Sequence, residues 1–230
     1  MTAFVLLPGM DGTGKLFDAF VAALGADHQI TVVSYPSDAS LGYGELEAVA
    51  RAALPVDRRY VLLAESFSGP IGISSAASKP LGLAGLVLCC TFARLPFPYA
   101  RWMRHLARAA PAWRVPETLV EWMLLGRHVT AELRRDVAAV LDQAPPAVLR
   151  RRLAESLAID ARPLLASIQV PTLYLRATDD RLIRRAASLG IAAALPQPQI
   201  QDLDAPHFLL QVQPRAAAEA VLAFASPLTD

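Results

Sequence analysis

The feature that most constrains the fold of this sequence is an alternation of short apolar runs with helical patterns. Six runs of five or six residues are bounded by glycine, proline or polar residues, and they have the length and composition of β-strands. The runs are Ala3–Leu7, Ile30–Ser34, Tyr60–Ala64, Gly85–Cys90, Thr172–Arg176 and Gln199–Leu203. Strands that alternate with helices are typical of a parallel sheet covered by helices on both faces. The sequence therefore predicts an α/β fold with a mostly parallel sheet of about six strands.

Helical patterns connect several of these runs. Apolar residues between Leu16 and Leu24 fall on one helical face, and Gly25 is placed to end that helix. A second helix is predicted from about Gly44 to Leu54. A last helix should follow Pro214, because a proline at a helix start loses no hydrogen bond.

The segment 93–165 interrupts the alternation. It contains no strand-like run, but it has several amphipathic helical patterns separated by prolines. We therefore expect residues 1–92 and 166–230 to form the core of one domain, and residues 93–165 to form an inserted helical cap. Within the cap, leucines recur every four residues from Leu149 to Leu157 beside Arg150–Arg152, which predicts a helix packed through its leucine face.

Charge is nearly balanced over the chain, with 22 lysines and arginines against 21 acidic residues. A net charge of +1 gives no field to hold nucleic acid or a membrane surface, and no apolar run approaches the roughly 20 residues of a membrane span. The first residues lack the basic region of a signal peptide. The expectation is a cytoplasmic protein that binds neither nucleic acid nor membranes.

A candidate nucleophile lies in the segment Ala64–Gly69, between the strand Tyr60–Ala64 and a helix-compatible run from Ile71. A sharp turn between a strand and a helix raises a serine hydroxyl above the end of a sheet, and small neighbours two residues before and after allow the turn. Ser66 has Ala64 and Ser68 at those positions. The simpler alternative is a serine that only caps the helix.

A serine nucleophile needs a base and a carboxylate that orients the base. Of the four histidines, only His207 follows a predicted strand, whereas His105 and His128 lie in the cap and are expected at its surface. Asp179 and Asp180 both follow the strand Thr172–Arg176 and are the candidate acids. The histidines and the two cysteines lack metal-binding spacing and no dinucleotide fingerprint is present, so we expect no metal and no cofactor.

With these residues in place, the chain resembles the α/β-hydrolase family, as a small serine esterase- or lipase-like member without the first two strands. In that family the catalytic residues follow the order Ser, acid, His. The resemblance implies Asp180 as the acid, because an aliphatic residue, here Ile183, stands three positions after it. It also implies that the backbone N–H groups of Met10 and Phe67 bind the oxyanion.

The oxyanion loop of the family corresponds to Pro8–Gly12, in which Pro8 stands where the family has a histidine. The segment Gly9–Leu16 also fits most of a phosphate-binding loop through Lys15. Its last position must be Ser or Thr to hold magnesium, and Leu16 cannot do this. A nucleotide-binding protein is therefore the weaker interpretation.

These inferences predict hydrolysis of a carboxylic ester or thioester through an acyl-enzyme on Ser66. An acyltransferase with the same three residues, or a noncatalytic binding module of the same fold, remains open. The cap suggests a partner for the acyl substrate, because 12 arginines against 7 acidic residues give it five surplus positive charges. Arg101, Arg104 and Arg108 would lie on one helical face and could attract an acidic acyl carrier protein, if they are not simply solvated.

Overall fold

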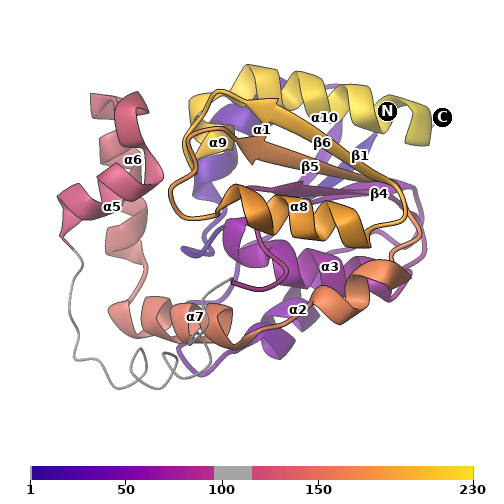
Figure 1. The fold of residues 1–230 in the computed structure, drawn as a ribbon, viewed down its shortest axis with the longest axis horizontal. Coiled ribbons are helices and arrows are strands. Elements are labelled where there is room, and N and C mark those ends of the chain that lie inside the picture. The colour runs from indigo at the N-terminus through magenta and orange to yellow at the C-terminus, as the bar shows by residue number, and fades with distance from the viewer. Residues whose placement is uncertain (1, 96–115, 230) are drawn as a thin grey trace.

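Six parallel strands form one sheet in the computed structural model, which describes residues 2–95 and 116–229 (Figure 1). The strands are β1 (Ala3–Leu7), β2 (Gln29–Val32), β3 (Tyr60–Glu65), β4 (Leu83–Cys89), β5 (Thr172–Ala177) and β6 (Pro198–Leu203). The predicted α/β sheet is confirmed. β2 ends at Val32, two residues before the predicted end, because this edge strand pairs only with β1 and Val32 lies opposite Leu6 near the end of β1.

Helices cover both faces of the sheet (Figure 1). The helices and 3-10 turns before β5 are η1 (Lys15–Phe17), α1 (Asp18–Leu24), α2 (Tyr43–Ala52), η2 (Ser66–Ser68), α3 (Gly69–Ala77), α5 (Glu117–Leu124), η3 (Gly126–His128), α6 (Ala131–Gln143), α7 (Pro146–Ala158) and η4 (Arg162–Ser167). Those after β5 are α8 (Arg185–Ala194), α9 (Leu209–Val212) and α10 (Pro214–Thr229). The three helices predicted next to strands are thus present, and Gly25 follows α1 with a φ of 89°.

Alternate residues of each central strand enter two different cores, as the two-residue period of a strand requires. In β1, Val5 packs in a core with residues of α2, α3 and α8, whereas Phe4 and Leu6 pack in a second core with residues of α1, α9 and α10. All five residues of β1 are buried. The unbroken apolar character of these runs therefore reflects burial on both faces of the sheet.

The order of the strands places a topological switch point at the carboxyl-terminal ends of β1 and β3. The chain runs from β1 outward to the edge strand β2 and then returns across β1 to β3. At such a switch point the loops after the two central strands leave in opposite directions, and ligands bind between them. The loop after β1 and Ser66 after β3 meet at this point.

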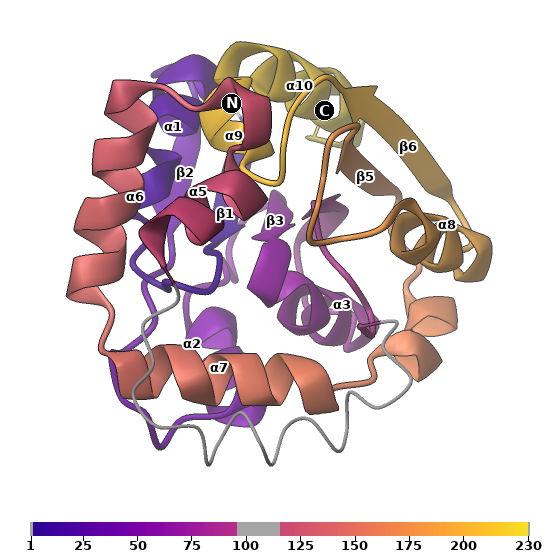
Figure 2. The ribbon, with the colours of Figure 1, turned by 60° about the vertical axis from the view of Figure 1, so that its left-hand side comes forward.

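Between β4 and β5 the described chain forms only helices and 3-10 turns. Figures 1 and 2 show α5 and α6 on the side to which the strands point, with α7 below them. The division into a core and a cap over residues 93–165 stays our prediction. Of the helices that the structure describes, none is long and apolar enough to cross a membrane.

The leucine face predicted for α7 is confirmed only in part, because Leu157 is buried but Leu153 is not. Leu153 is 42% exposed, whereas Arg152 is only 1% exposed and lies on a buried face with Val148 and Ser156. A spacing of four residues puts these three side chains on one side of the helix. The arginine can be buried because its guanidinium finds backbone carbonyl oxygens as hydrogen-bond acceptors.

Candidate active site

Ser66 occupies a strained turn between β3 and α3. Its φ is 48°, in the left-handed region that costs a residue other than glycine about 1–3 kcal/mol. Hydrogen bonds hold the turn: the Thr91 hydroxyl donates to the Ser66 carbonyl, and the Tyr43 hydroxyl donates to the Phe67 carbonyl at 2.9 Å. The ring of Tyr43 also stacks on Phe67 with a centroid distance of 4.7 Å. The surrounding structure thus maintains a conformation that an isolated chain would avoid.

Small residues allow β3 and α3 to approach closely. A Cβ atom placed on Gly72 would lie 2.6 Å from the Cβ of Ala64, so the two elements touch at this point. The other small neighbour of Ser66 is Ser68, which is fully buried and donates a hydrogen bond to the Pro8 carbonyl. Its hydroxyl also accepts one from Tyr35 at 2.8 Å. Ser68 therefore links the turn to the loop after β1, in addition to being small.

The structure brings Ser66, His207 and Asp180 into one hydrogen-bonded chain. The Oγ of Ser66 lies 2.8 Å from Nε2 of His207, and Nδ1 of His207 lies 2.9 Å from Oδ2 of Asp180. The other oxygen of Asp180, Oδ1, accepts the backbone N–H groups of Leu182 and Ile183 at 2.8 Å each. Because the carboxylate only accepts, Nδ1 of the histidine carries the proton and Nε2 is free to accept from Ser66.

Electrostatics favour a charged His207 in spite of its burial. Burial alone lowers the pKa of this imidazole, but the charge of Asp180 and its hydrogen bond outweigh that effect, so the pKa is raised. Glu65 also raises this pKa through its charge. An imidazole with these neighbours is a stronger base toward the Ser66 hydroxyl.

Glu65 is a buried carboxyl at the end of β3 that the sequence analysis did not single out. Burial raises its pKa to about 7, and its Oε1 accepts a hydrogen bond from Nε2 of Gln211 at 3.0 Å. The only sequence signal was an acidic residue at the end of an apolar strand. That position suggests proximity to Ser66 but not burial.

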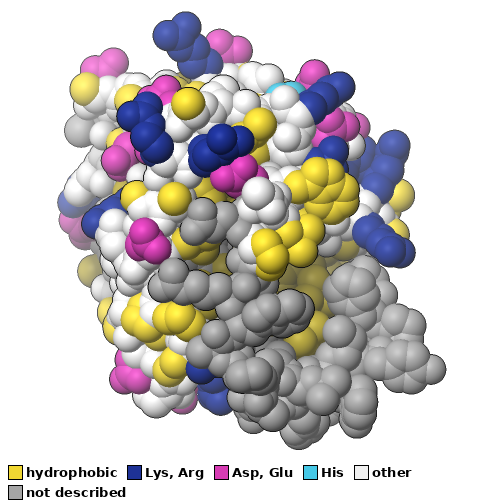
Figure 3. All heavy atoms as spheres, turned by 90° about the vertical axis from the view of Figure 1, so that its left-hand side faces the viewer, with side chains coloured by type: hydrophobic (Ala, Val, Ile, Leu, Met, Phe, Trp, Pro, Cys, Tyr) yellow, Lys and Arg dark blue, Asp and Glu magenta, His cyan; other side chains and the backbone are white. Residues whose placement is uncertain are grey.

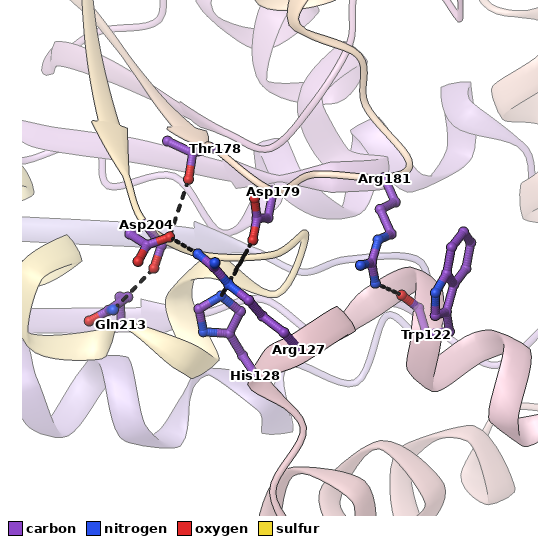
Figure 4. Close-up of polar contacts among 8 residues, drawn as sticks. All are labelled: Trp122, Arg127, His128, Thr178, Asp179, Arg181, Asp204 and Gln213. Atoms are coloured by element: carbon purple, nitrogen blue, oxygen red, sulfur yellow. Dashed lines mark hydrogen bonds and ion pairs between the residues drawn. The ribbon is translucent and has the colours of Figure 1, made fainter.

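Asp179, the other candidate acid, pairs with Arg127 of η3. Its Oδ2 lies 3.0 Å from Nε of Arg127, and a second nitrogen of Arg127 lies 2.6 Å from Oδ1 of Asp204 (Figure 4). His128 was expected at the surface but is partly buried, with Nε2 3.8 Å from Asp179. These contacts join η3 to the loops that carry Asp180 and His207.

The same cluster contains three groups that could ligate a metal ion. Within the described residues, His128, Asp179 and Asp204 offer ligand atoms within 4.8 Å of one another. The guanidinium of Arg127 forms ion pairs with both carboxylates, and a positive charge there opposes a bound cation. The cluster is explained by this ion-pair network.

The loop after β1 forms a tight turn over Gly9–Gly12. The Gly12 N–H donates to the Gly9 carbonyl at 3.1 Å, which places Met10 in the middle of the turn. Phe67 directly follows Ser66 in η2, where the first N–H groups of a helical turn have no acceptor within it. Both predicted oxyanion-binding residues therefore lie at the switch point of the sheet. Lys15, the cation of the alternative phosphate loop, binds Gln143 of α6 at 2.5 Å.

The proposed carrier-binding residues Arg101, Arg104 and Arg108, and also His105, lie outside the described residues. Several described arginines of segment 93–165 pair with acids, as Arg134 does with Glu121 at 2.9 Å. Figure 3 accordingly shows basic and acidic side chains interspersed on the described part of the face seen there.

Comparison with known proteins identifies the family. The model of the alpha/beta hydrolase family matches residues 4–220, and the chain belongs to this family. A protein of Azorhizobium caulinodans, provisionally named carbamate hydrolase RutD, is 25% identical over 242 residues, which cover 97% of this chain and 91% of that protein.

Solved structures share the fold. A hydrolase from Oleispira antarctica superposes with a TM-score of 0.82 at 15% identity, covering 98% of this chain and 91% of the other. The enol-lactonase from Burkholderia xenovorans LB400 gives 0.79 at 19% identity, with the same coverage of both chains. A thermophilic esterase from Thermogutta terrifontis gives 0.79 at 20% identity, covering 100% of this chain and 91% of that one.

Proposed function

We propose that this protein is a serine hydrolase that cleaves carboxylic esters or thioesters through an acyl-enzyme on Ser66. The observation that carries this proposal is the continuous chain from the Ser66 hydroxyl through His207 to Asp180, with distances of 2.8 and 2.9 Å. A nucleophile, its base and the group that orients the base are thereby within reach of one another. The strained turn at Ser66 supports the same assignment, because strain of this kind clusters at active sites.

The reaction follows from this geometry. Ser66 Oγ attacks the acyl carbonyl carbon while Nε2 of His207 takes the hydroxyl proton of Ser66. The resulting oxyanion accepts hydrogen bonds from the backbone N–H groups of Met10 and Phe67. His207 then returns the proton to the alcohol or thiol as the ester bond breaks. Water next attacks the acyl-enzyme, its proton passing through His207 to Ser66, and a carboxylic acid leaves. Asp180 stabilises the transient imidazolium.

The substrate class is inferred from the chemistry of the proposed nucleophile and from the names of similar proteins. The relatives include proteins named as a carbamate hydrolase, an enol-lactonase and an esterase, all of whose substrates have a carbonyl bonded to a leaving group. An acyltransferase would use the same three residues and replace water with an alcohol. Product that forms only when an alcohol acceptor is supplied would favour that alternative.

The test combines labelling with turnover. A fluorophosphonate probe should label the wild-type protein at Ser66, and p-nitrophenyl esters from acetate to palmitate should be hydrolysed with a preference that reports acyl length. Ser66→Ala should abolish both signals with the fold intact, whereas Ser78→Ala, at the far end of α3, should retain both. Activity of Ser66→Ala within about tenfold of wild type would exclude Ser66 as the nucleophile.

A further inference from the structure

Arg152 of α7 is the largest fully buried side chain among the described residues, and the proposed mechanism does not use it. Its Nη1 donates to the carbonyls of Met10 at 2.8 Å and Asp11 at 2.6 Å, and its Nη2 donates to the carbonyl of Pro36 at 3.1 Å. Within the described part of the chain, backbone carbonyls therefore receive all of its hydrogen bonds. Two of them belong to the turn that carries the proposed oxyanion-binding Met10.

Four consecutive carbonyl groups of this loop each accept a hydrogen bond. Those of Met10 and Asp11 accept from Arg152, that of Gly9 accepts from the Gly12 N–H, and that of Gly12 accepts from the Tyr35 N–H at 2.8 Å. In a trans peptide the N–H points opposite to the preceding carbonyl. Bonds to four consecutive carbonyls therefore also fix the direction of the N–H groups of the turn.

The turn is shaped to receive this side chain. Gly12 has a φ of 75°, which favours glycine, and a Cβ atom placed on it would overlap the guanidinium of Arg152 where it now lies. The Cζ of Arg152 also lies 5.8 Å from the centre of the Tyr35 ring, a favourable position for a cation. Burial lowers the pKa of Arg152, with the charge of Asp11 acting in the opposite direction.

Burying a guanidinium costs free energy that an apolar side chain of similar size would not. The buried guanidinium of Arg152 must therefore have a specific role that an apolar side chain could not fill. We propose that Arg152 is a positioning residue of the oxyanion hole: it holds the Gly9–Gly12 turn so that the Met10 N–H meets the substrate oxyanion. This inference rests on the proposed ester hydrolysis at Ser66, and it makes α7 a part of the active site.

The test uses Arg152→Ala and Arg152→Lys, with Arg151→Ala as the matched control, since Arg151 lies next along α7 and pairs with Glu155 through side chains that are 30% and 18% exposed. Loss of an oxyanion donor typically lowers kcat about 10²- to 10³-fold. We expect Arg152→Ala to lower kcat in this range with KM changed less than about threefold. Arg152→Lys, which keeps the charge with a single ammonium, should retain more activity, and Arg151→Ala should resemble wild type.

Two readouts separate positioning from a merely structural role. Millimolar guanidinium chloride should restore part of the kcat of Arg152→Ala, because it refills the vacated site. Affinity for a trifluoromethyl ketone, which forms an oxyanion adduct with Ser66, should fall with kcat/KM, whereas affinity for the corresponding uncharged alcohol should not.

Circular dichroism and thermal unfolding establish that the variants are folded. A folded Arg152→Ala whose kcat stays within threefold of wild type would overturn the proposal, as would equal losses of affinity for ketone and alcohol. If Arg152→Ala does not fold, Arg152→Met, which fills the site without the charge or the donors, carries the same two criteria. Failure of the proposed function itself appears differently, as a wild-type protein that neither hydrolyses esters nor reacts with fluorophosphonate at Ser66.

Discussion

Replacement of Asp180 by asparagine tests the orientation of His207 most directly. The two backbone N–H groups of Leu182 and Ile183 bind Oδ1 of Asp180, so in Asp180→Asn they should select the amide oxygen for this position. The amide nitrogen then faces Nδ1 of His207, which lies 2.9 Å from Oδ2 in the native protein. Because an NH₂ group donates, Nδ1 must become the acceptor. The imidazole proton moves to Nε2, where it blocks proton transfer from Ser66.

The expected loss is large because the substitution reverses a donor and an acceptor without changing shape. The same substitution in the chymotrypsin-type triad lowers kcat by about 10⁴. We expect a loss of about 10³- to 10⁴-fold here, equivalent to about 4–5.5 kcal/mol of transition-state stabilisation. Asp179→Asn is the matched control. It weakens an ion pair with Arg127 whose side chains are 39% and 62% exposed, and such pairs contribute about 0–1 kcal/mol.

The assay is the hydrolysis of one p-nitrophenyl ester at pH 8 by the two variants and the wild type, with thermal unfolding measured in parallel. Asp179→Asn should keep kcat/KM within about fivefold of wild type, because a weakened surface ion pair shifts no proton in the site. Equal losses in the two variants, or a larger loss in Asp179→Asn, would refute the assignment of Asp180. A small loss in both would refute the role of an orienting carboxylate altogether.

Two further predictions concern pH. In the wild type, kcat/KM should decrease at low pH with a pKa above the ordinary 6.5 of histidine, because His207 must be neutral to accept a proton and its pKa is raised. Glu65→Gln removes a nearby negative charge, so it should shift this acid limb of the profile toward lower pH. If the acid limb of Glu65→Gln coincides with that of the wild type, the charge of Glu65 does not affect the pKa of His207. The free energy of unfolding should fall as pH rises from 4.5 to about 7, since folded Glu65 keeps a proton that the unfolded chain releases. The decrease from this group is up to about 3 kcal/mol, so urea unfolding at pH 5 and 8 should differ more for wild type than for Glu65→Gln.

The fold could be predicted from the sequence because its determinants are local. Runs such as Ala3–Leu7 carry their strand character in composition and length, and Gly25 and Pro214 delimit helices through their own backbone preferences. The small residues that permit the turn at Ser66 can also be read from the sequence, since Ala64 and Gly72 allow β3 and α3 to approach closely. His207 could be placed near Ser66 because parallel strands end at the same edge of a sheet.

Other features depended on contacts between distant segments. Asp179 and Asp180 are neighbours with the same chemistry, and only the folded loop directs one to Arg127 and the other to His207. Glu65 gave no signal of its raised pKa, because burial is a property of what packs over a residue.

The burial of Arg152 differs most from what the sequence pattern predicts. A helical period assigns an arginine between leucines to the solvent, since charge burial is unfavourable without partners. Its partners are the carbonyls of Met10, Asp11 and Pro36, which lie more than a hundred residues away in sequence. Sequence periodicity records how polar a side chain is, but not whether the folded backbone presents acceptors to it. The sequence by itself therefore determined the sheet and the order of Ser66, Asp180 and His207, and the tertiary structure decided which charged groups are buried around them.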